Sequence, residues 1–485
     1  MNSPFVEISG AAGGDYVSDE SRLRGRALGI CLPDTAAEAA RAVAYAAGRS
    51  LPLTVQGGLT GITGGAVPMD SCILNLSRLT ALGDPDGDLL ITAGAGVSLD
   101  ALRSHIAPRG LCFPPDPTES SALLGGMAAT NASGAVSFGY GPMRRWTEGL
   151  ELVTADGELR TLRRGEVFAS GYDFELFGVR GTLPRVHPVN VKSAAGLYIR
   201  PDMDLLDLFI GSEGILAVIT GVTLRLTEQP QVCGAIMFLD REETALSLTE
   251  RLRQTPELHT AAIEYFDGGA LDLLTHMRES RGAFEHIRRV PEGAGCAIYA
   301  ELHPRDDSEL EVLLELTEEY GIEEDRMLCG FDPEALQPLK AFRHAVPEAV
   351  NMLIGEKKRR DPSITKLGTD MSVPDEYLRD TVAMYRRDLE ESGLDFVIFG
   401  HIGDNHLHVN IIPDSAEEYA RGKELYKKWA ARVASLGGSV SAEHGIGKLK
   451  KDFLPLMYSP EELEGMRYLK GLFDPSNILN RGNML

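Results

Sequence analysis

The strongest constraint on the fold is a glycine-rich segment between two β-type runs. Residues 57–65 contain five glycines, and the flanking runs are "LPLTVQ" (51–56) and "CILNLS" (72–77). A P-loop requires Lys followed by Ser or Thr after its last glycine, whereas Ala66 and Val67 follow here. A Rossmann fingerprint requires a helix directly after the glycines, whereas Pro68 and then a strand follow. The segment therefore joins strand to strand, and its bare N–H groups favour anion binding over a plain turn.

The pattern of the chain changes near Pro230. Before it, short β-type runs alternate with helical stretches such as 35–50 and 98–110. Between 234 and 330 strands and helices alternate, which is typical of a sheet backed by helices. Further helices are expected at 376–392 and 416–436. The predicted organisation is an N-terminal segment 1–29, a first domain 30–228, a second domain 229–436 and a C-terminal segment 437–485.

Composition excludes several classes of protein. The 485 residues are 43% apolar and 25% charged, as in a globular, soluble protein. With 48 basic and 71 acidic residues the net charge is −23, so nucleic acid is not an expected partner. No apolar stretch approaches the roughly 18 to 20 residues of a transmembrane helix. The basic run 357–360 is expected to be a solvated loop, with a docking patch for an acidic partner as the alternative.

Cysteine usage points to a reducing compartment. The six cysteines are scattered, no C-x-x-C occurs, and the N-terminus lacks the order of a signal peptide. Iron–sulfur or zinc-ribbon ligation by this chain is therefore not expected. A cytoplasmic location is predicted, with a peripheral position at the inner membrane as the alternative.

Three histidines fall within eight positions of the stretch "FGHIGDNHLHVN" (399–410). We expect two strands joined by a turn at Gly403–Asn405, because Asp and Asn tolerate left-handed backbone conformations. His406, His408 and Asn410 would then share one face of the second strand, with His401 across the hairpin. Imidazoles on adjacent strands are a common beginning of a divalent metal site, although surface histidines remain an alternative.

A third metal ligand has to come from elsewhere. The segment "SVSAEHGIGKLK" (439–450) offers Glu443 and His444 in a loop of small residues. On its own this pair could equally mark the start of a helix.

Two further segments are rich in small residues. Residues 113–141 contain "PPDPTE", a glycine pair and "ATNASG", and residues 204–226 contain "LFIGSEGILAVIT". Small residues let two backbones, or a backbone and a flat ring, approach closely, although tight helix packing would also use them.

Together these segments resemble the flavin-binding core of the vanillyl-alcohol oxidase / p-cresol methylhydroxylase family. More narrowly, the chain from about residue 30 to 481 resembles the branch of FAD-linked D-lactate, glycolate and D-2-hydroxyglutarate dehydrogenases. The resemblance implies an α+β fold with a two-subdomain FAD-binding domain and an α+β substrate domain that carries an antiparallel sheet. The C-terminal segment would complete the active site and return to the FAD domain.

The resemblance implies that FAD is bound by three groups of residues. The first loop would donate to the pyrophosphate, the second segment would form a wall beside the adenosine and flavin, and two residues would lie behind it. In that order the residues are Gly57, Gly58, Leu59, Thr60, Gly61, Gly64 and Gly65; Thr118, Gly125, Gly126, Asn131, Ser133 and Gly134; Gly214 and Ile219. Covalent members of the family often carry a histidine in the first loop, and this loop has none, so noncovalent FAD is implied.

The same resemblance assigns roles around the histidines. Related dehydrogenases carry G-H-x-G-D-G-N-L-H and E-H-G-I-G motifs, which makes His401, His408 and Glu443 the implied metal ligands. His444 would be the acid/base and Asn410 would assist the substrate. This chain has Asn405 and His406 where the related motif has glycine and asparagine. The motif spacing selects His408, and we do not expect His406 to bind the metal.

Two segments match the family's carboxylate-binding stretches. They are "KAFRHAVPEAVN" (340–351) and "TKLGTDMSVP" (365–374), and the residues carried over are Arg343 and Lys366. Arginine suits a carboxylate because its planar fork bonds both oxygens, although each residue could also make an ordinary surface ion pair.

The expected reaction is oxidation of a D-2-hydroxy acid to the 2-oxo acid, with hydride transfer to FAD. D-Lactate is the expected substrate, and glycolate and D-2-hydroxyglutarate are alternatives. Zn²⁺ suits the ligand set, with Mn²⁺ and Fe²⁺ as alternatives. Two rival functions remain at this point, namely a non-redox alkyl transferase that uses FAD and a metal-dependent hydrolase.

The reduced flavin would pass its electrons to an acceptor. A quinone, a cytochrome, an electron-transfer flavoprotein or an iron–sulfur partner subunit would each serve, and a homodimer is an open alternative.

Overall fold

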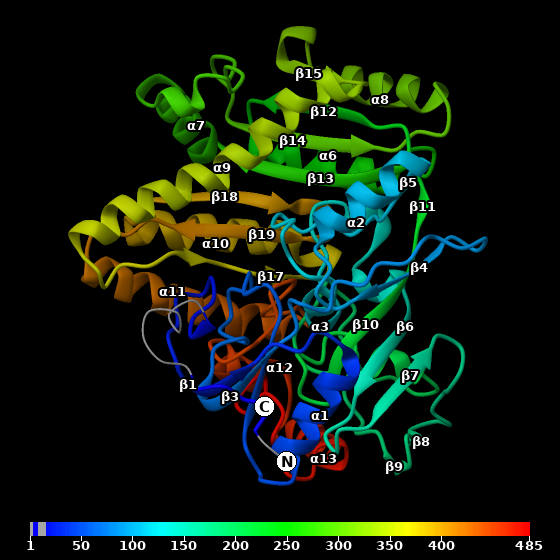
Figure 1. Cartoon of the computed structure of the whole chain (residues 1–485). Coiled ribbons are helices and arrows are strands. Elements are labelled where there is room, and N and C mark those ends of the chain that lie inside the picture. The colour runs from blue at the N-terminus through cyan, green and yellow to red at the C-terminus, as the bar shows by residue number, and fades with distance from the viewer. Residues whose placement is uncertain (1–2, 8–15) are drawn as a thin grey trace.

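The computed structural model describes residues 3–7 and 16–485. Figure 1 shows a lower part that contains both termini and an upper part built around one large sheet. In the described part of the chain no helix has both the length and the apolar composition that crossing a membrane requires.

The lower part contains two larger sheets. A three-stranded sheet has the order β1-β3-β2, and a four-stranded sheet has the order β4-β10-β6-β7. The elements are β1 (Arg26–Cys31), α1 (Ala36–Ala47), β2 (Leu53–Gln56), β3 (Met69–Asn75), β4 (Leu90–Gly94), α2 (Leu99–Ile106), β5 (Leu111–Cys112), α3 (Leu124–Thr130), α4 (Ser137–Tyr140), α5 (Met143–Trp146), β6 (Thr147–Val153), β7 (Leu159–Arg163), β8 (Asp173–Leu176), β9 (Val179–Thr182), β10 (Val218–Arg225) and β11 (Thr227–Glu228).

The glycine-rich segment is the connection between β2 and β3, as the sequence predicts. β2 and β3 run parallel, so between them the chain must return to the end of the sheet at which β2 begins. Residues 57–68 make that return without a helix. The four-stranded sheet, by contrast, has antiparallel pairs throughout.

The upper part is built around an eight-stranded sheet with the order β15-β12-β14-β13-β18-β19-β16, and β17 also pairs with β19. All of its strand pairs are antiparallel, which confirms the expected antiparallel sheet. Its elements are β12 (Cys233–Leu239), α6 (Glu242–Gln254), β13 (Thr260–Asp267), α7 (Gly268–Ser280), β14 (Cys296–Leu302), α8 (Ser308–Glu319), β15 (Met327–Gly330), α9 (Pro333–Arg360), β16 (Leu367–Gly368), β17 (Met371–Ser372), α10 (Leu378–Ser392), β18 (Phe396–His401), β19 (His406–Ile411) and α11 (Ala416–Ser435).

Helices cover both faces of this sheet because alternate residues of a strand point to opposite sides. On one side Ile236 and Phe238 of β12 pack with apolar residues of α7 and α9. On the other side Ala235 and Met237 belong to a larger cluster that includes residues of α6, α8, α10 and α11. With both faces buried, the strands are almost continuously apolar, so a charged side chain inside them is conspicuous.

The basic run Lys357–Arg360 is not a loop, contrary to the prediction. It forms the last turn of α9, a helix of 28 residues that continues through two internal prolines. The helix persists because its apolar stripe, which includes Phe342 and Val350, is buried against the sheet. Positive charge at a helix C-terminus is also favourable, and Lys357 Nζ lies 2.7 Å from Asp414.

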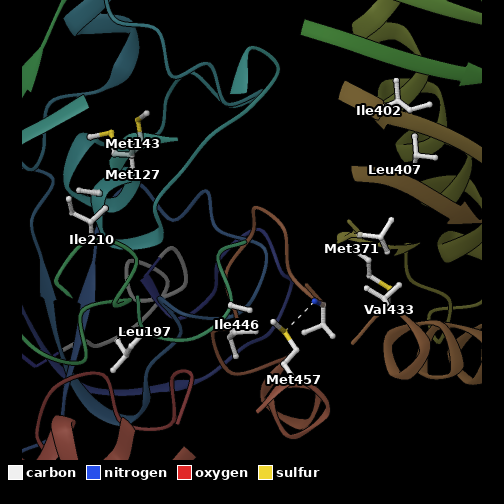
Figure 2. Packing of buried hydrophobic residues seen from close by; sticks show 14 of the residues in the cluster. Met127, Met143, Leu197, Ile210, Met371, Ile402, Leu407, Val433, Ile446 and Met457 are labelled. Atoms are coloured by element: carbon white, nitrogen blue, oxygen red, sulfur yellow. Dashed lines mark hydrogen bonds between the residues drawn. The ribbon is translucent and has the colours of Figure 1, made fainter. Parts of the chain in front are cut away.

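The C-terminal segment returns to the lower part through α12 (Leu454–Met457) and α13 (Pro460–Phe473). Leu53 N donates to Ile478 O at 2.7 Å, and Asn480 N donates to Leu53 O at 2.9 Å, so this segment extends along β2. Figure 2 shows Met127 and Met143 of the lower part and Ile402 and Leu407 of the upper part as members of one buried cluster.

Candidate active site

The histidine stretch forms the predicted hairpin of β18 and β19. His401 is directly opposite His406 in the antiparallel register, so their side chains lie on the same face. A single 3₁₀ turn over residues 402–404 is followed by Asn405 at φ 52°, the left-handed conformation that asparagine tolerates. Leu407 and Val409 point to the opposite face and are buried in the core.

The three imidazoles form one cluster beside Glu443. One ring nitrogen from each of His401, His406 and His408 lies within 4.8 Å of the others. Glu443 Oε2 is 3.5 Å from His401 Nε2 and 3.7 Å from His406 Nδ1. The structure thus brings together the predicted ligands His401, His408 and Glu443, and His406 does not point away from them.

Two acceptors fix the orientation of the His401 and His408 imidazoles. His401 Nδ1 lies 2.9 Å from Glu264 Oε1, and His408 Nδ1 lies 2.9 Å from the backbone oxygen of Thr369. Each ring therefore keeps Nε2 free to face the cluster. Burial opposes ionisation of Glu264, but the charges of His401 and Arg343 outweigh it and lower the pKa of that carboxyl to about 2.

Asp370 connects the cluster with His444. Its oxygens lie 3.0 Å from His406 Nε2, 3.1 Å from His444 Nδ1 and 2.6 Å from Lys450 Nζ. They also accept the backbone N–H groups of Glu443 and His444, each at 3.1 Å. Although burial opposes ionisation, the charges of His444 and Lys450 hold the pKa of Asp370 well below its usual range.

His444 has the environment of an oriented base. Its Nδ1 faces the Asp370 carboxylate, while the side chain is 29% exposed and Nε2 has no hydrogen-bond partner among the described residues. A carboxylate that receives Nδ1–H leaves the lone pair of Nε2 free to accept a proton.

Lys192 places a cation beside the cluster. Its Nζ lies 2.8 Å from Glu443 Oε2 and 3.5 Å from Asp404 Oδ2, and only 8% of the side chain is exposed. Burial disfavours the ammonium, but the charge of Glu443 prevails and raises the pKa of Lys192. In turn, despite its own burial, Glu443 has a pKa well below the usual range because of Lys192 and His401.

The predicted substrate residues surround this cluster. Arg343 of α9 donates from Nε to Glu264 Oε1 at 3.0 Å, the same oxygen that His401 approaches. Lys366 precedes β16, is exposed and pairs with no carboxylate in the described part of the chain. Asn410 is 1% exposed, and its Oδ1 has no donor among the described residues.

The first glycine segment presents free backbone donors. The N–H groups of residues 58–65 donate to no backbone or side-chain acceptor in the described part of the chain, whereas Val67 N donates to Gly64 O. A Cβ added to Gly61 would meet no atom within 4 Å, so the backbone there is bare. The loop contains the expected residues Gly57, Gly58, Leu59, Thr60, Gly61, Gly64 and Gly65.

The second segment lies against the first. A Cβ on Gly57 would approach Gly126 Cα to 3.9 Å, while a Cβ on Gly126 would itself meet open space. Both observations fit a ligand that lies over the two backbones, which is how a nucleotide contacts glycine loops.

The remaining residues predicted to bind FAD differ in their surroundings. Asn131 ends α3 in the left-handed conformation and accepts the N–H of Arg144, and Gly125 is packed against Ala95. Thr118 is exposed, whereas Ile219 is a buried residue of β10. Gly214 adopts φ 68° beside Asn480, whose side chain bonds both Val55 N and Glu213 O.

The glycine segments contact the loop that carries Glu443 and His444. Ser133 Oγ donates to Glu443 Oε2 at 3.4 Å, and Thr63 Oγ1 donates to the backbone oxygen of His444 at 3.4 Å. Glu213 accepts the N–H groups of Ile446 at 2.6 Å and Gly447 at 2.8 Å. The candidate flavin wall, the candidate base and the histidine cluster therefore lie together.

Sequence reasoning missed four residues of this site, namely Lys192, Glu213, Glu264 and Asp370. A usable signal existed for Glu264, which is a carboxylate in the middle of a largely apolar strand, and for Glu213 and Asp370, which lie inside segments already identified. For Lys192 no local pattern distinguishes it from a surface lysine.

The chain is similar to known FAD-linked proteins along most of its length. Residues 229–484 match the family described as "FAD linked oxidases, C-terminal domain", and residues 27–163 match the one described as "FAD binding domain". The chain is 30% identical over 478 residues to D-2-hydroxyglutarate dehydrogenase of Xanthomonas citri pv. viticola, covering 94% of this chain and 89% of the relative. It is 30% identical over 470 residues to D-lactate dehydrogenase of Archaeoglobus fulgidus, covering 94% of this chain and 91% of the relative.

Solved structures share the fold at lower identity. A 4-ethylphenol oxidase from Gulosibacter chungangensis superposes with a TM-score of 0.67 at 16% identity, over 100% of this chain and 94% of that chain. An alkyldihydroxyacetonephosphate synthase gives 0.65 at 17% identity, over 95% of this chain and 76% of that chain. The fold is that of the vanillyl-alcohol oxidase / p-cresol methylhydroxylase group. The chain belongs to the FAD-linked oxidases, and it is an FAD-linked oxidoreductase.

Proposed function

We propose that this protein is a D-2-hydroxy acid dehydrogenase that oxidises D-lactate to the 2-oxo acid. The observation that carries the proposal is the 3.4 Å contact between Ser133 Oγ and Glu443 Oε2. This contact joins the candidate flavin wall to a cluster of imidazoles and a candidate base. The names of the relatives, D-lactate and D-2-hydroxyglutarate dehydrogenase, support the substrate class.

The residues present fit a bound FAD. The unpaired N–H groups of residues 58–65 suit a pyrophosphate, and the open backbone at Gly61 and Gly126 leaves room for one. When bound, FAD supplies the acceptor for the C2 hydride of the substrate. Residues 113–141 form the wall that contacts the histidine hairpin, where Phe138 packs against Gly403.

The cluster fits a divalent metal. The ligands carried over are His401, His408 and Glu443, and two imidazoles with one carboxylate are a common catalytic set for Zn²⁺, with Mn²⁺ and Fe²⁺ as alternatives. The buried Asn410 Oδ1 and His406 Nδ1 have no hydrogen-bond partner in the described part of the chain, which supports a bound group at this place. A divalent metal would supply a Lewis acid that lowers the pKa of the substrate hydroxyl.

Arg343 and Lys366 would bind the substrate carboxylate, and Asn410 would contact the bound substrate through its free Oδ1. His444 would accept the hydroxyl proton at Nε2, while Asp370 holds the ring through Nδ1 at 3.1 Å. Lys192 keeps Glu443 ionised throughout.

The charge distribution favours a monocarboxylate. Beyond Arg343 and Lys366, D-2-hydroxyglutarate would need another cation for its second carboxylate. Lys192 does not supply it, because its ammonium is paired with Glu443. Glycolate would make the same carboxylate contacts. Because it lacks the methyl group of D-lactate, it would leave the space for that group unfilled.

Anaerobic flavin reduction by a substrate panel tests the proposal. The purified protein should be yellow, and D-lactate should bleach it under argon faster than L-lactate, glycolate or D-2-hydroxyglutarate. A colourless protein would favour a metal-dependent hydrolase. A yellow protein that none of these acids bleaches would favour the alkyl transferase, and fastest bleaching by D-2-hydroxyglutarate would replace D-lactate as the substrate.

A further inference from the structure

We propose that His406 is a further metal ligand, so that His401, His406, His408 and Glu443 form a site of three imidazoles and one carboxylate. This inference rests on the proposed function, in which the cluster holds a divalent metal. It departs from the motif of the related dehydrogenases, which has asparagine at this position.

The strand register places His406 inside the cluster. His406 is directly opposite His401 and lies two residues from His408, so all three rings project from the same face of the hairpin. The three ring centroids form a triangle, with 4.5 Å between His406 and His408, 5.4 Å between His401 and His406, and 5.6 Å between His401 and His408. A metal bound by His401 and His408 would therefore also lie beside His406.

Glu443 is nearly as close to His406 as to His401. Its Oε2 lies 3.7 Å from His406 Nδ1 and 3.5 Å from His401 Nε2. Two ligand atoms on a tetrahedral zinc, with bonds of about 2.0 Å, lie roughly 3.3 Å apart. Both separations are therefore near those of ligands that share one ion.

His406 is buried with one ring nitrogen unpaired. Its side chain is 0% exposed, and Nε2 faces Asp370 Oδ1 at 3.0 Å, whereas Nδ1 has no hydrogen-bond partner among the described residues. Leaving a buried polar atom unpaired carries a free-energy cost. A metal at Nδ1 would remove this cost.

The surroundings of the ring match those of the other two. Asp370 Oδ1 lies 3.0 Å from His406 Nε2, as Glu264 and Thr369 O lie near the Nδ1 atoms of His401 and His408. An acceptor that faces one nitrogen leaves the other free for a metal. The nitrogen that would bind the metal is therefore Nδ1 in His406 and Nε2 in His401 and His408.

Lys192 gives a reason for the additional imidazole. Its ammonium shares Glu443 Oε2 at 2.8 Å, so the carboxylate is a weaker partner for a cation here than an unshared carboxylate would be. A third neutral nitrogen donor compensates for that shared charge.

X-ray absorption of the zinc-loaded holoenzyme counts the imidazoles directly. We expect three in the wild type and two in His406→Asn, which introduces the asparagine of the related motif. Chelator competition should show that His406→Asn binds zinc at least about tenfold more weakly, because changes even outside the ligand shell cost 10–100-fold in affinity. The control is His303→Asn, a largely buried histidine paired with Glu301 and outside the cluster, which should bind zinc as the wild type does.

The outcomes separate the two proposals. A wild-type protein that takes up no stoichiometric zinc overturns the proposed metal role and this inference with it. A wild-type protein that binds zinc through two imidazoles, with unchanged affinity in His406→Asn, overturns the inference alone. If His406→Asn does not fold, the imidazole count of the wild type still decides.

Discussion

At the scale of single residues, Arg343 and His444 are held in the same way. A carboxylate holds one nitrogen of each side chain: Glu264 holds Nε of Arg343, and Asp370 holds Nδ1 of His444. In the described part of the chain the other nitrogens of both groups have no hydrogen-bond partner. A group that is fixed on one side and free on the other is preorganised for a ligand, because little rotamer entropy remains to be lost.

The first prediction concerns Arg343→Met. Loss of a charge-assisted contact to the substrate carboxylate should weaken transition-state binding by roughly 2–5 kcal/mol and lower kcat/KM accordingly. FAD should be retained. Steady-state kinetics with D-lactate and the flavin spectrum measure both effects. The control is Lys340→Met, an exposed position one turn earlier on α9, which should leave kcat/KM near wild type. An unchanged kcat/KM in Arg343→Met would remove this residue from the site.

His444→Asn tests the base. Removal of the proposed general base should lower kcat by about 10²–10⁴-fold without loss of flavin. Stopped-flow measurement of anaerobic flavin reduction isolates this step from later turnover. His187→Asn, a half-exposed histidine that pairs with Glu462, is the matched control and should reduce its flavin at the wild-type rate. A normal reduction rate in His444→Asn would show that the proton leaves by another route.

At the scale of elements, the site depends on turns that hold two backbones close together. Gly134 adopts φ 107°, and a Cβ there would lie 1.8 Å from the Asp116 carbonyl oxygen. Around it, Asp116 N donates to Ser133 O and Ala135 N donates to Asp116 O. This close approach positions Ser133, whose hydroxyl reaches Glu443.

We therefore expect Gly134→Ala to lower both the melting temperature and the FAD occupancy. Backbone strain of this kind costs about 1–3 kcal/mol, and the clash with the Asp116 oxygen adds to it. Calorimetry and the ratio of flavin to protein absorbance measure the two effects. Gly110→Ala is the control, because Gly110 also has a positive φ, of 69°, but a Cβ there would meet open space. If both variants lose equal amounts of thermal stability and FAD, the close approach of Gly134 to Asp116 does not itself stabilise the site.

At the scale of the whole molecule, the site is assembled from both parts of the chain. The glycine segments come from the lower part and the histidine hairpin from the upper part (Figure 1), and the C-terminal segment bridges them. Lys448 donates to Gly64 O and Gly65 O, while Leu53 pairs with residues 478 and 480. Flavin binding should accordingly depend on the intact tertiary structure and not on a covalent bond.

Acid precipitation tests this expectation. The first glycine segment contains no histidine that could bond to the flavin ring, so the yellow colour should pass into the supernatant when the protein is denatured. The absorbance of the supernatant and of the redissolved pellet measures the partition. A pellet that stays yellow would demonstrate a covalent link and contradict the prediction.

Local sequence determined much of this protein. The loop between β2 and β3, the histidine hairpin with Asn405 in the left-handed conformation, and the shared face of His401, His406 and His408 follow from glycine, turn chemistry and a period of two. These features involve neighbours in the chain or on adjacent strands, so short-range rules suffice. The same rules failed for Lys357–Arg360, because burial of α9 against the sheet prolongs the helix beyond its local preference.

Only the tertiary structure decided which charged groups meet at the site. Asp370 lies 36 residues before His406 and 74 before His444, and Lys192 lies 251 residues before Glu443, yet these groups are within 3.1 Å of their partners. No local periodicity reports such pairs. A buried charge is tolerated only beside its counter-charge, and the packing of the two parts of the chain decides which counter-charge that is.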